Sequence, residues 1–109
     1  MMKLNDYQVA AMATAVYPDY VGLAYTSLGL AGEAGEIANK VKKIYRDNDG
    51  ELTRHMQADL MDELGDVLWY VAALTTEIGY DLDDVAQHNL EKLAARKARN
   101  AINGTGDKR

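Results

Sequence analysis

The chain has 109 residues, of which 48% are hydrophobic and 27% are charged, and its formal net charge is −5. This length allows one domain, expected to span residues 1–109, and the composition excludes a chain that is disordered throughout. Because cysteine is absent, disulfides, thiolate zinc sites and cysteine nucleophiles are excluded. The acidic balance argues against a nucleic-acid polymer as a partner, since such a partner needs a broad basic surface.

Neither the first residues of the sequence nor its longest apolar run indicates a membrane protein. The first residues, MMKLNDYQ, lack the apolar core of a signal peptide. The longest apolar run, VLWYVAAL at 67–74, is too short to span a bilayer. We therefore expect a soluble cytoplasmic protein with no membrane partner.

The first half of the chain predicts two helices. Asn5 is a suitable N-cap with Gln8 three residues later, and Pro18 should end this first helix. The second helix should run from Tyr20 to about Arg46, because its apolar residues recur at helical spacing.

The second half predicts two more helices after an Asp/Asn/Gly-rich loop at 46–52. Thr53 should cap a third helix that ends at Gly79, and Asp81 should cap a fourth that reaches about Ile102. The two middle helices would each be about 38 Å long, which is long for so small a chain. The expected fold is therefore all-α, a four-helix bundle completed by oligomerisation.

Two pairs of carboxylates stand out on the middle helices. Glu33 and Glu36 are three residues apart in GLAGEAGEIANKVKK, and Glu63 and Asp66 are three apart in DELGD. Residues at i and i+3 share one side of a helix, so antiparallel packing would bring the four carboxylates together. Oxygen ligands without thiolate or imidazole select a hard cation, Mg²⁺ or Mn²⁺.

These pairs allow two other interpretations. An isolated ExxE is usually a solvated helix face, but here both pairs border apolar arcs and have glycines close by. A di-iron carboxylate bundle needs Glu-x-x-His pairs, and neither His55 nor His88 lies three residues after a glutamate.

The combined pattern resembles a known family. GLAGEAGEIANKVKK, DELGDVLWYVAAL and NLEKLAARK are similar to segments of the MazG-like all-α nucleoside triphosphate pyrophosphohydrolases, whose motif is ExxE, a spacer and ExxD. Here 26 residues separate Glu36 from Glu63, which fits the spacer. The final NGTGDKR resembles a GxGDxR tail found in compact, often phage-encoded members, which would place the protein in the host cytoplasm.

The resemblance implies hydrolysis of a nucleoside triphosphate to its monophosphate and pyrophosphate, with Mg²⁺ or Mn²⁺ and more than one ion per site. It implies that the metal ligands are Glu33, Glu36, Glu63 and Asp66. Glu36 and Glu63 are predicted to be catalytic, with Glu36 accepting a proton from the attacking water. The phage-like tail favours a deoxynucleotide, with dGTP a candidate by analogy. Gly22 and Gly29 share the side of Glu33 and Glu36, where a bare backbone would let the triphosphate come close.

Further residues are predicted to contact the nucleotide. Lys40 and Lys43 follow the first pair on the same side, although a Glu36–Lys40 ion pair accounts for Lys40 equally well. Tyr70 lies one turn after Asp66 and could stack on a base, with Tyr17 or Trp69 contributing. The resemblance implies phosphate contacts from the last helix, through Asn89, Lys92 and Arg96. It also implies that the tail 103–109 closes over the nucleotide, through Asp107 and Arg109.

Several questions stay open at this point. Phosphoribosyl-ATP is an alternative substrate, because relatives of similar architecture handle it. A non-catalytic helical adaptor is an alternative function, in which the carboxylates only keep a helix in water. The expected partner is a second copy of the chain, in a homodimer or a tetramer made of two dimers. Base selectivity and the phosphorus that water attacks do not follow from the sequence.

Overall fold

The computed structural model describes residues 1–99 as an all-helical protein. Its elements are α1 (Leu4–Met12), a short 3-10 helix η1 (Asp19–Val21), α2 (Gly22–Asn48), α3 (Arg54–Glu77) and α4 (Leu82–Ala98). Residues 1–99 contain no strand, so the all-α prediction is confirmed. The tail predicted to close over the nucleotide, 103–109 with Asp107 and Arg109, lies outside the described residues. None of the helices found up to residue 99 combines the length and apolar character needed to cross a bilayer.

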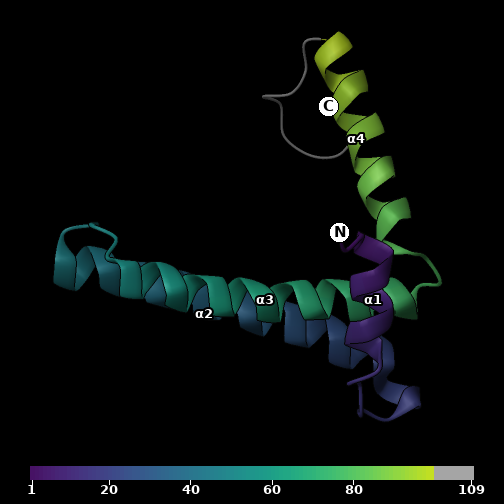
Figure 1. The fold of residues 1–109 in the computed structure, drawn as a ribbon, viewed down its shortest axis with the longest axis horizontal. Helices are drawn as coiled ribbons and strands as arrows, with labels where there is room; N and C mark the ends of the chain where they lie inside the picture. The colour runs from purple at the N-terminus through teal and green to yellow at the C-terminus, as the bar shows by residue number, and fades with distance from the viewer. Residues whose placement is uncertain (100–109) are drawn as a thin grey trace.

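The long helices α2 and α3 form an antiparallel hairpin and lie side by side along their length (Figure 1). The turn at 49–53 uses left-handed backbone at Asp49 (φ 53°) and Gly50 (φ 81°), which ends α2 and reverses the chain. The hydroxyl of Thr53 accepts a hydrogen bond from the N–H of Met56 at 3.1 Å. The predicted cap of the third helix is therefore confirmed.

Helix α1 is shorter than the sequence predicts. It ends at Met12, well before Pro18. The carbonyl of Ala11 accepts hydrogen bonds from the Thr14 hydroxyl at 2.6 Å and from the indole N–H of Trp69 at 3.2 Å. The Trp69 side chain of α3 thus occupies the Ala11 carbonyl, which would accept a backbone hydrogen bond if α1 were longer. The chain after α1 instead forms a loop over α3.

Two polar side chains of α1 cap α4 across the fold. The prediction that Asn5 caps the first helix is wrong, because Lys3 is the N-cap. Instead, the side-chain oxygen of Asn5 accepts the N–H of Asp83 at 3.0 Å, and that of Gln8 accepts the N–H of Leu82 at 2.7 Å. The first N–H groups of a helix have no partner within it, so these bonds fix the start of α4 against α1.

Helix α4 starts where the sequence predicts and then leaves the hairpin. Asp81 and Asp84 form a capping box, with the N–H of Asp81 donating to the carboxylate of Asp84 at 3.1 Å. Figure 1 shows α4 rising from the end of α3, away from the length of the hairpin. The four described helices therefore do not close into a bundle within one chain.

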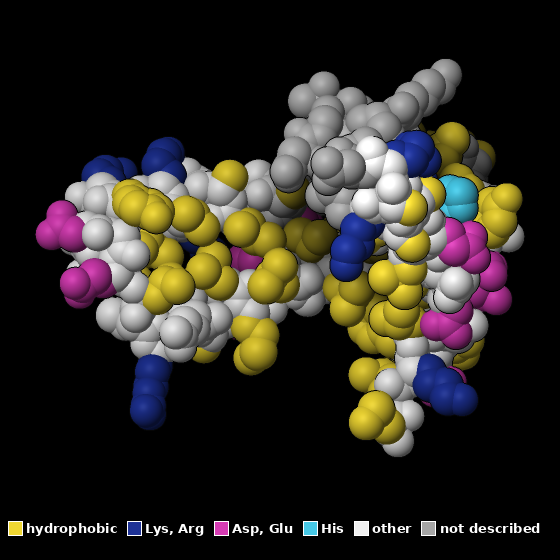
Figure 2. Space-filling view, turned by 90° about the horizontal axis from the view of Figure 1, so that it is seen from above, with side chains coloured by type: hydrophobic (Ala, Val, Ile, Leu, Met, Phe, Trp, Pro, Cys, Tyr) yellow, Lys and Arg dark blue, Asp and Glu magenta, His cyan; other side chains and the backbone are white. Residues whose placement is uncertain are grey.

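A row of apolar side chains on α3 stays exposed as a result. Met61, Leu64 and Leu68, at i, i+3 and i+7, are 67%, 57% and 40% exposed. Figure 2 shows many apolar side chains across the hairpin and α4. The described core is correspondingly small, built around Ala72 and Leu82. A second copy that completes the bundle stays a prediction.

Replacing Gln8 with alanine should destabilise the fold by about 2 kcal/mol, because it leaves the buried start of α4 without an acceptor. The Gln8 amide also donates to the Thr76 hydroxyl at 2.9 Å and to the carbonyl of Tyr80 at 3.1 Å. Urea unfolding measures the change. The control is Gln57→Ala, at an exposed position of α3. Equal free energies of unfolding for the two variants would contradict this role for Gln8.

Candidate functional site

Three carboxylates meet at the middle of the hairpin. Glu33 comes from α2, and Glu63 and Asp66 come from one side of α3. One oxygen from each lies within 4.8 Å of the others, close enough for a single cation to bind all three. The two helices bring these residues together only because they run antiparallel with Glu33 opposite the ExxD pair. Glu36, the fourth predicted ligand, is exposed and lies outside this group.

The group carries an excess of negative charge. Burial raises the pKa of Glu33, the charges of Asp66 and Glu63 raise it further, and a hydrogen bond with Glu63 and the charge of Glu36 add to the effect. Such a rise is the mark of carboxylates that lack a positive partner. The donor set is all oxygen, which matches the preference of Mg²⁺ and Mn²⁺. The residues present therefore fit a hard divalent cation.

One lysine partly balances this charge. The ammonium of Lys40 lies 3.1 Å from a carboxylate oxygen of Glu63, and this contact raises the pKa of Lys40. The alternative pairing of Lys40 with Glu36 along α2 is not among the ion pairs of residues 1–99. Lys40 instead joins the two helices at the edge of the carboxylate group.

An aromatic pocket adjoins the group on the side of η1. It has a volume of about 340 Å³, and Glu33 and Asp66 form part of its wall. The other residues that line it are Thr14, Val16, Tyr17, Tyr25, Trp69 and Tyr70. Two of the wall residues are therefore shared with the candidate cation site.

The rings of this pocket contact one another. Tyr17 stacks on Tyr25 with centroids 4.8 Å apart, and Trp69 meets Tyr70 edge to face at 5.0 Å. The indole N–H of Trp69 also donates to the Thr14 hydroxyl at 2.9 Å, which holds the loop after α1 against α3. A planar ligand could stack on these rings within reach of the carboxylates.

The glycines have another role than the sequence suggests. A Cβ added at Gly29 would overlap the ring of Tyr70, and one at Gly22 would overlap the carboxylate of Glu77. The expectation that their bare backbone admits a triphosphate is therefore wrong, because side chains of α3 fill that space. Gly29 instead lets the Tyr70 ring lie against α2 beside the candidate cation site.

Apart from Lys40, which contacts Glu63, the remaining predicted residues belong neither to the carboxylate group nor to the lining of the aromatic pocket within one chain. Lys40 and Lys43 line a second pocket, toward the turn of the hairpin. Asn89 and Lys92 line a third, beside the start of α4, and Arg96 is buried further along α4. Tyr25 was not among the predicted residues, although it lies eight residues before Glu33 on α2, a little over two helical turns away.

The fold and the site define an all-α protein in which three carboxylates that could hold a cation lie beside an aromatic pocket. Residues 23–100 match the MazG nucleotide pyrophosphohydrolase domain, and the chain belongs to this family. The resemblance seen in the ExxE and ExxD motifs is thereby confirmed.

The chain is similar in sequence to two other proteins. It is 52% identical to the Gene 37 protein of Mycobacterium phage L5, over 99% of this chain and 100% of that protein. It is 39% identical to the uncharacterized protein YvdC of Bacillus subtilis (strain 168), over 62% of this chain and 68% of that protein. The similarity to a phage protein agrees with the phage-type tail noted in the sequence. No solved structure matches the chain.

Replacing Glu33 with glutamine should raise the melting temperature of the protein in EDTA at pH 7.5. Because the pKa of Glu33 is raised in the fold, its ionised form opposes folding at a pH above that raised pKa. At a pH below the unfolded value of this pKa, the carboxyl is protonated in both states and the advantage of glutamine should disappear. Calorimetry from pH 7.5 to pH 3.5 measures this. A glutamine variant that melts below wild type at pH 7.5 would contradict the repulsion.

Proposed function

We propose that the chain hydrolyses a nucleoside triphosphate to the monophosphate and pyrophosphate, with Mg²⁺ or Mn²⁺ held by Glu33, Glu63 and Asp66. The observation that carries the proposal is the shared wall between these carboxylates and the aromatic pocket. A cation site alone would suit many hydrolases. A cation site that opens onto stacked rings suits a ligand with a polyphosphate at one end and a base at the other.

The residues of the site would have different roles in the reaction. A bound divalent cation, or a pair of them, would neutralise the triphosphate and make a bound water more acidic. Glu36 stands outside the three-carboxylate group, so its carboxylate would be free to accept the proton of the attacking water. Tyr70 and Tyr25 would hold the base. Hydrogen bonding with Tyr25 and burial raise the pKa of Tyr70.

The substrate is proposed to be a deoxynucleotide, with dGTP among the candidates. The similarity to a mycobacteriophage protein and the phage-like tail of the sequence support this choice by analogy. Stacking on tyrosine and tryptophan accepts any base, so the rings themselves set no preference. The reaction would act on the nucleotide pool of the host cytoplasm.

A second copy of the chain is proposed to complete the site, in a homodimer or a tetramer. The exposed apolar row on α3, which contains Met61 and Leu64, supports such an interface. Asn89, Lys92 and Arg96 stay proposed substrate contacts. Because α4 leaves the hairpin, these residues would reach a nucleotide on the hairpin of the second copy.

A panel of the eight common ribo- and deoxynucleoside triphosphates tests the function, with Mg²⁺ and then Mn²⁺. Pyrophosphate should be released from at least one of them. Glu63→Gln should lower kcat/KM by about 100-fold or more, because it removes a charged ligand of the cation. The control is Asp62→Asn, the exposed neighbouring carboxylate on α3.

Circular dichroism should show the same helix content in wild type and both variants. Release of no pyrophosphate from any nucleotide would contradict the proposal and favour the adaptor. Equal activity of Glu63→Gln and wild type would remove the three carboxylates from the reaction.

A further inference from the structure

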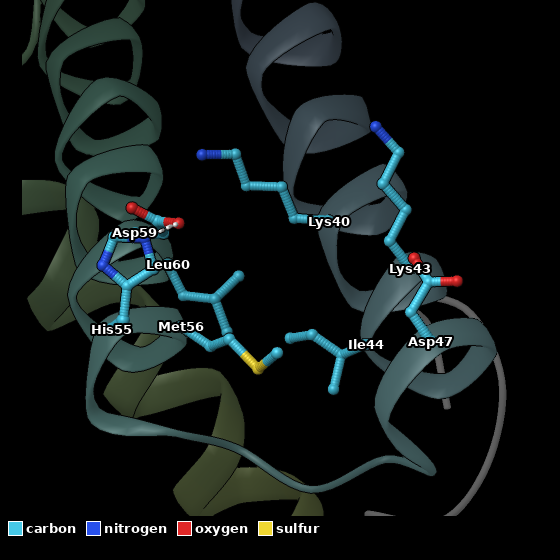
Figure 3. Close-up of a pocket in the computed structure, with 8 residues that line it drawn as sticks. All are labelled: Lys40, Lys43, Ile44, Asp47, His55, Met56, Asp59 and Leu60. Carbon is cyan, nitrogen blue, oxygen red and sulfur yellow. Dashed lines mark ion pairs between the residues drawn. The ribbon is translucent and has the colours of Figure 1, made fainter.

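A second pocket lies on the opposite side of the carboxylate group from the aromatic pocket, toward the turn of the hairpin. Its volume is about 350 Å³. Ile44 from α2 and Met56 and Leu60 from α3 form an apolar floor, and Figure 3 shows these three side chains directed toward one another between the helices. We call it the hairpin pocket.

The lysines of the hairpin pocket extend toward the candidate cation site. Figure 3 shows Lys40 and Lys43 rising from α2, away from the turn. This direction follows from helix geometry, because side chains tilt toward the N-terminus of their helix. Lys40 contacts Glu63 at 3.1 Å, and Lys43 lies about 4.5 Å further along the helix axis. Both lysines therefore line the pocket, with Lys40 directed toward α3 at the end nearest the carboxylates.

The acidic side chains of this pocket already have partners. Asp59 faces the imidazole of His55 at 3.6 Å, and Asp47 holds the guanidinium of Arg46 through two hydrogen bonds of 2.8 Å. Lys43 has no ion pair within residues 1–99, although its charge helps to lower the pKa of Asp47. Lys43 is thus available for an anion that enters the pocket.

The two pockets beside the carboxylates differ in chemistry. The aromatic pocket is lined by four rings and two carboxylates, and no lysine, arginine or histidine is among its described lining residues. The hairpin pocket has two lysines and no aromatic ring except the imidazole of His55. The candidate cation site lies between them, since Glu33 and Asp66 belong to the aromatic pocket and Glu63 contacts Lys40.

We propose that the hairpin pocket binds the pyrophosphate part of the substrate, and that the nucleotide lies along the hairpin in one direction. The base would occupy the aromatic pocket, the α-phosphate would lie at the carboxylates, and the β- and γ-phosphates would extend over Lys40 and Lys43. This inference deepens the proposed function and rests on it. The apolar floor would strengthen the attraction between the lysines and the phosphates, because it excludes water on one side.

The test measures binding of each product separately, by calorimetry in excess Mg²⁺, so it needs no turnover. The probes are inorganic pyrophosphate and each of the four deoxynucleoside monophosphates. Lys43→Ala should weaken pyrophosphate binding roughly fivefold or more and leave monophosphate binding within about twofold. Tyr25→Leu should show the reverse pattern. The control is Lys42→Ala, which removes an exposed lysine of α2 that does not line the pocket.

Three results would overturn the assignment. The first is a failure of pyrophosphate to bind, and the second is a loss of pyrophosphate affinity in Lys42→Ala as large as that in Lys43→Ala. A loss of monophosphate binding in Lys43→Ala without a loss of pyrophosphate binding would reverse the direction of the nucleotide. A chain that turns over no nucleotide but binds pyrophosphate through Lys43 would instead refute the proposed function and keep the hairpin pocket as a pyrophosphate site.

Discussion

The register of α2 against α3 controls the chemistry of this protein. Glu33 belongs to one helix, and Glu63 and Asp66 belong to the other, so only their antiparallel packing brings three carboxylate oxygens within 4.8 Å. The same packing seats the Tyr70 ring against Gly29, which leaves no room for a side chain on α2 at that point. A slip of one residue would turn each of these side chains by about 100° and separate the group.

This arrangement gathers negative charge at a cost to stability. Carboxylates at close range oppose folding unless a cation lies between them, and burial together with the charges of Asp66 and Glu63 raises the pKa of Glu33. Lys40 offsets part of it through Glu63. The fold around the site is secured by contacts further along the hairpin, where Gln8 caps α4 and Trp69 bonds to the loop after α1. A bound cation would therefore stabilise the protein as well as complete its site.

Local sequence signals predicted much of the fold. The caps at Thr53 and Asp81 were found because such caps depend on residues only three positions away. The convergence of Glu33 with the ExxD pair followed from helical spacing plus antiparallel packing. The direction of α4 did not follow, because it depends on bonds from α1 to residues more than 70 positions away.

Misassigned and missed residues share one physical cause. Asn5 was assigned to the wrong helix because its acceptor serves a helix that is distant in sequence. The early end of α1 depends on an indole from α3, and the roles of Gly22 and Gly29 depend on side chains of α3. Such contacts between helices are set by tertiary packing, which one sequence without coordinates does not give. Tyr25 is the exception, since its spacing of eight residues from Glu33 along one helix is a local signal that could have indicated it.

Binding of Mn²⁺, followed by electron paramagnetic resonance, tests the central claim most directly. Glu33→Gln and Asp66→Asn remove one ligand from each helix, and each should weaken Mn²⁺ binding about tenfold or more. Asp62→Asn, which removes an exposed carboxylate of α3, should leave it within about twofold. If Glu33→Gln binds Mn²⁺ as tightly as wild type, the cation is not held between α2 and α3, and the account of the site is wrong.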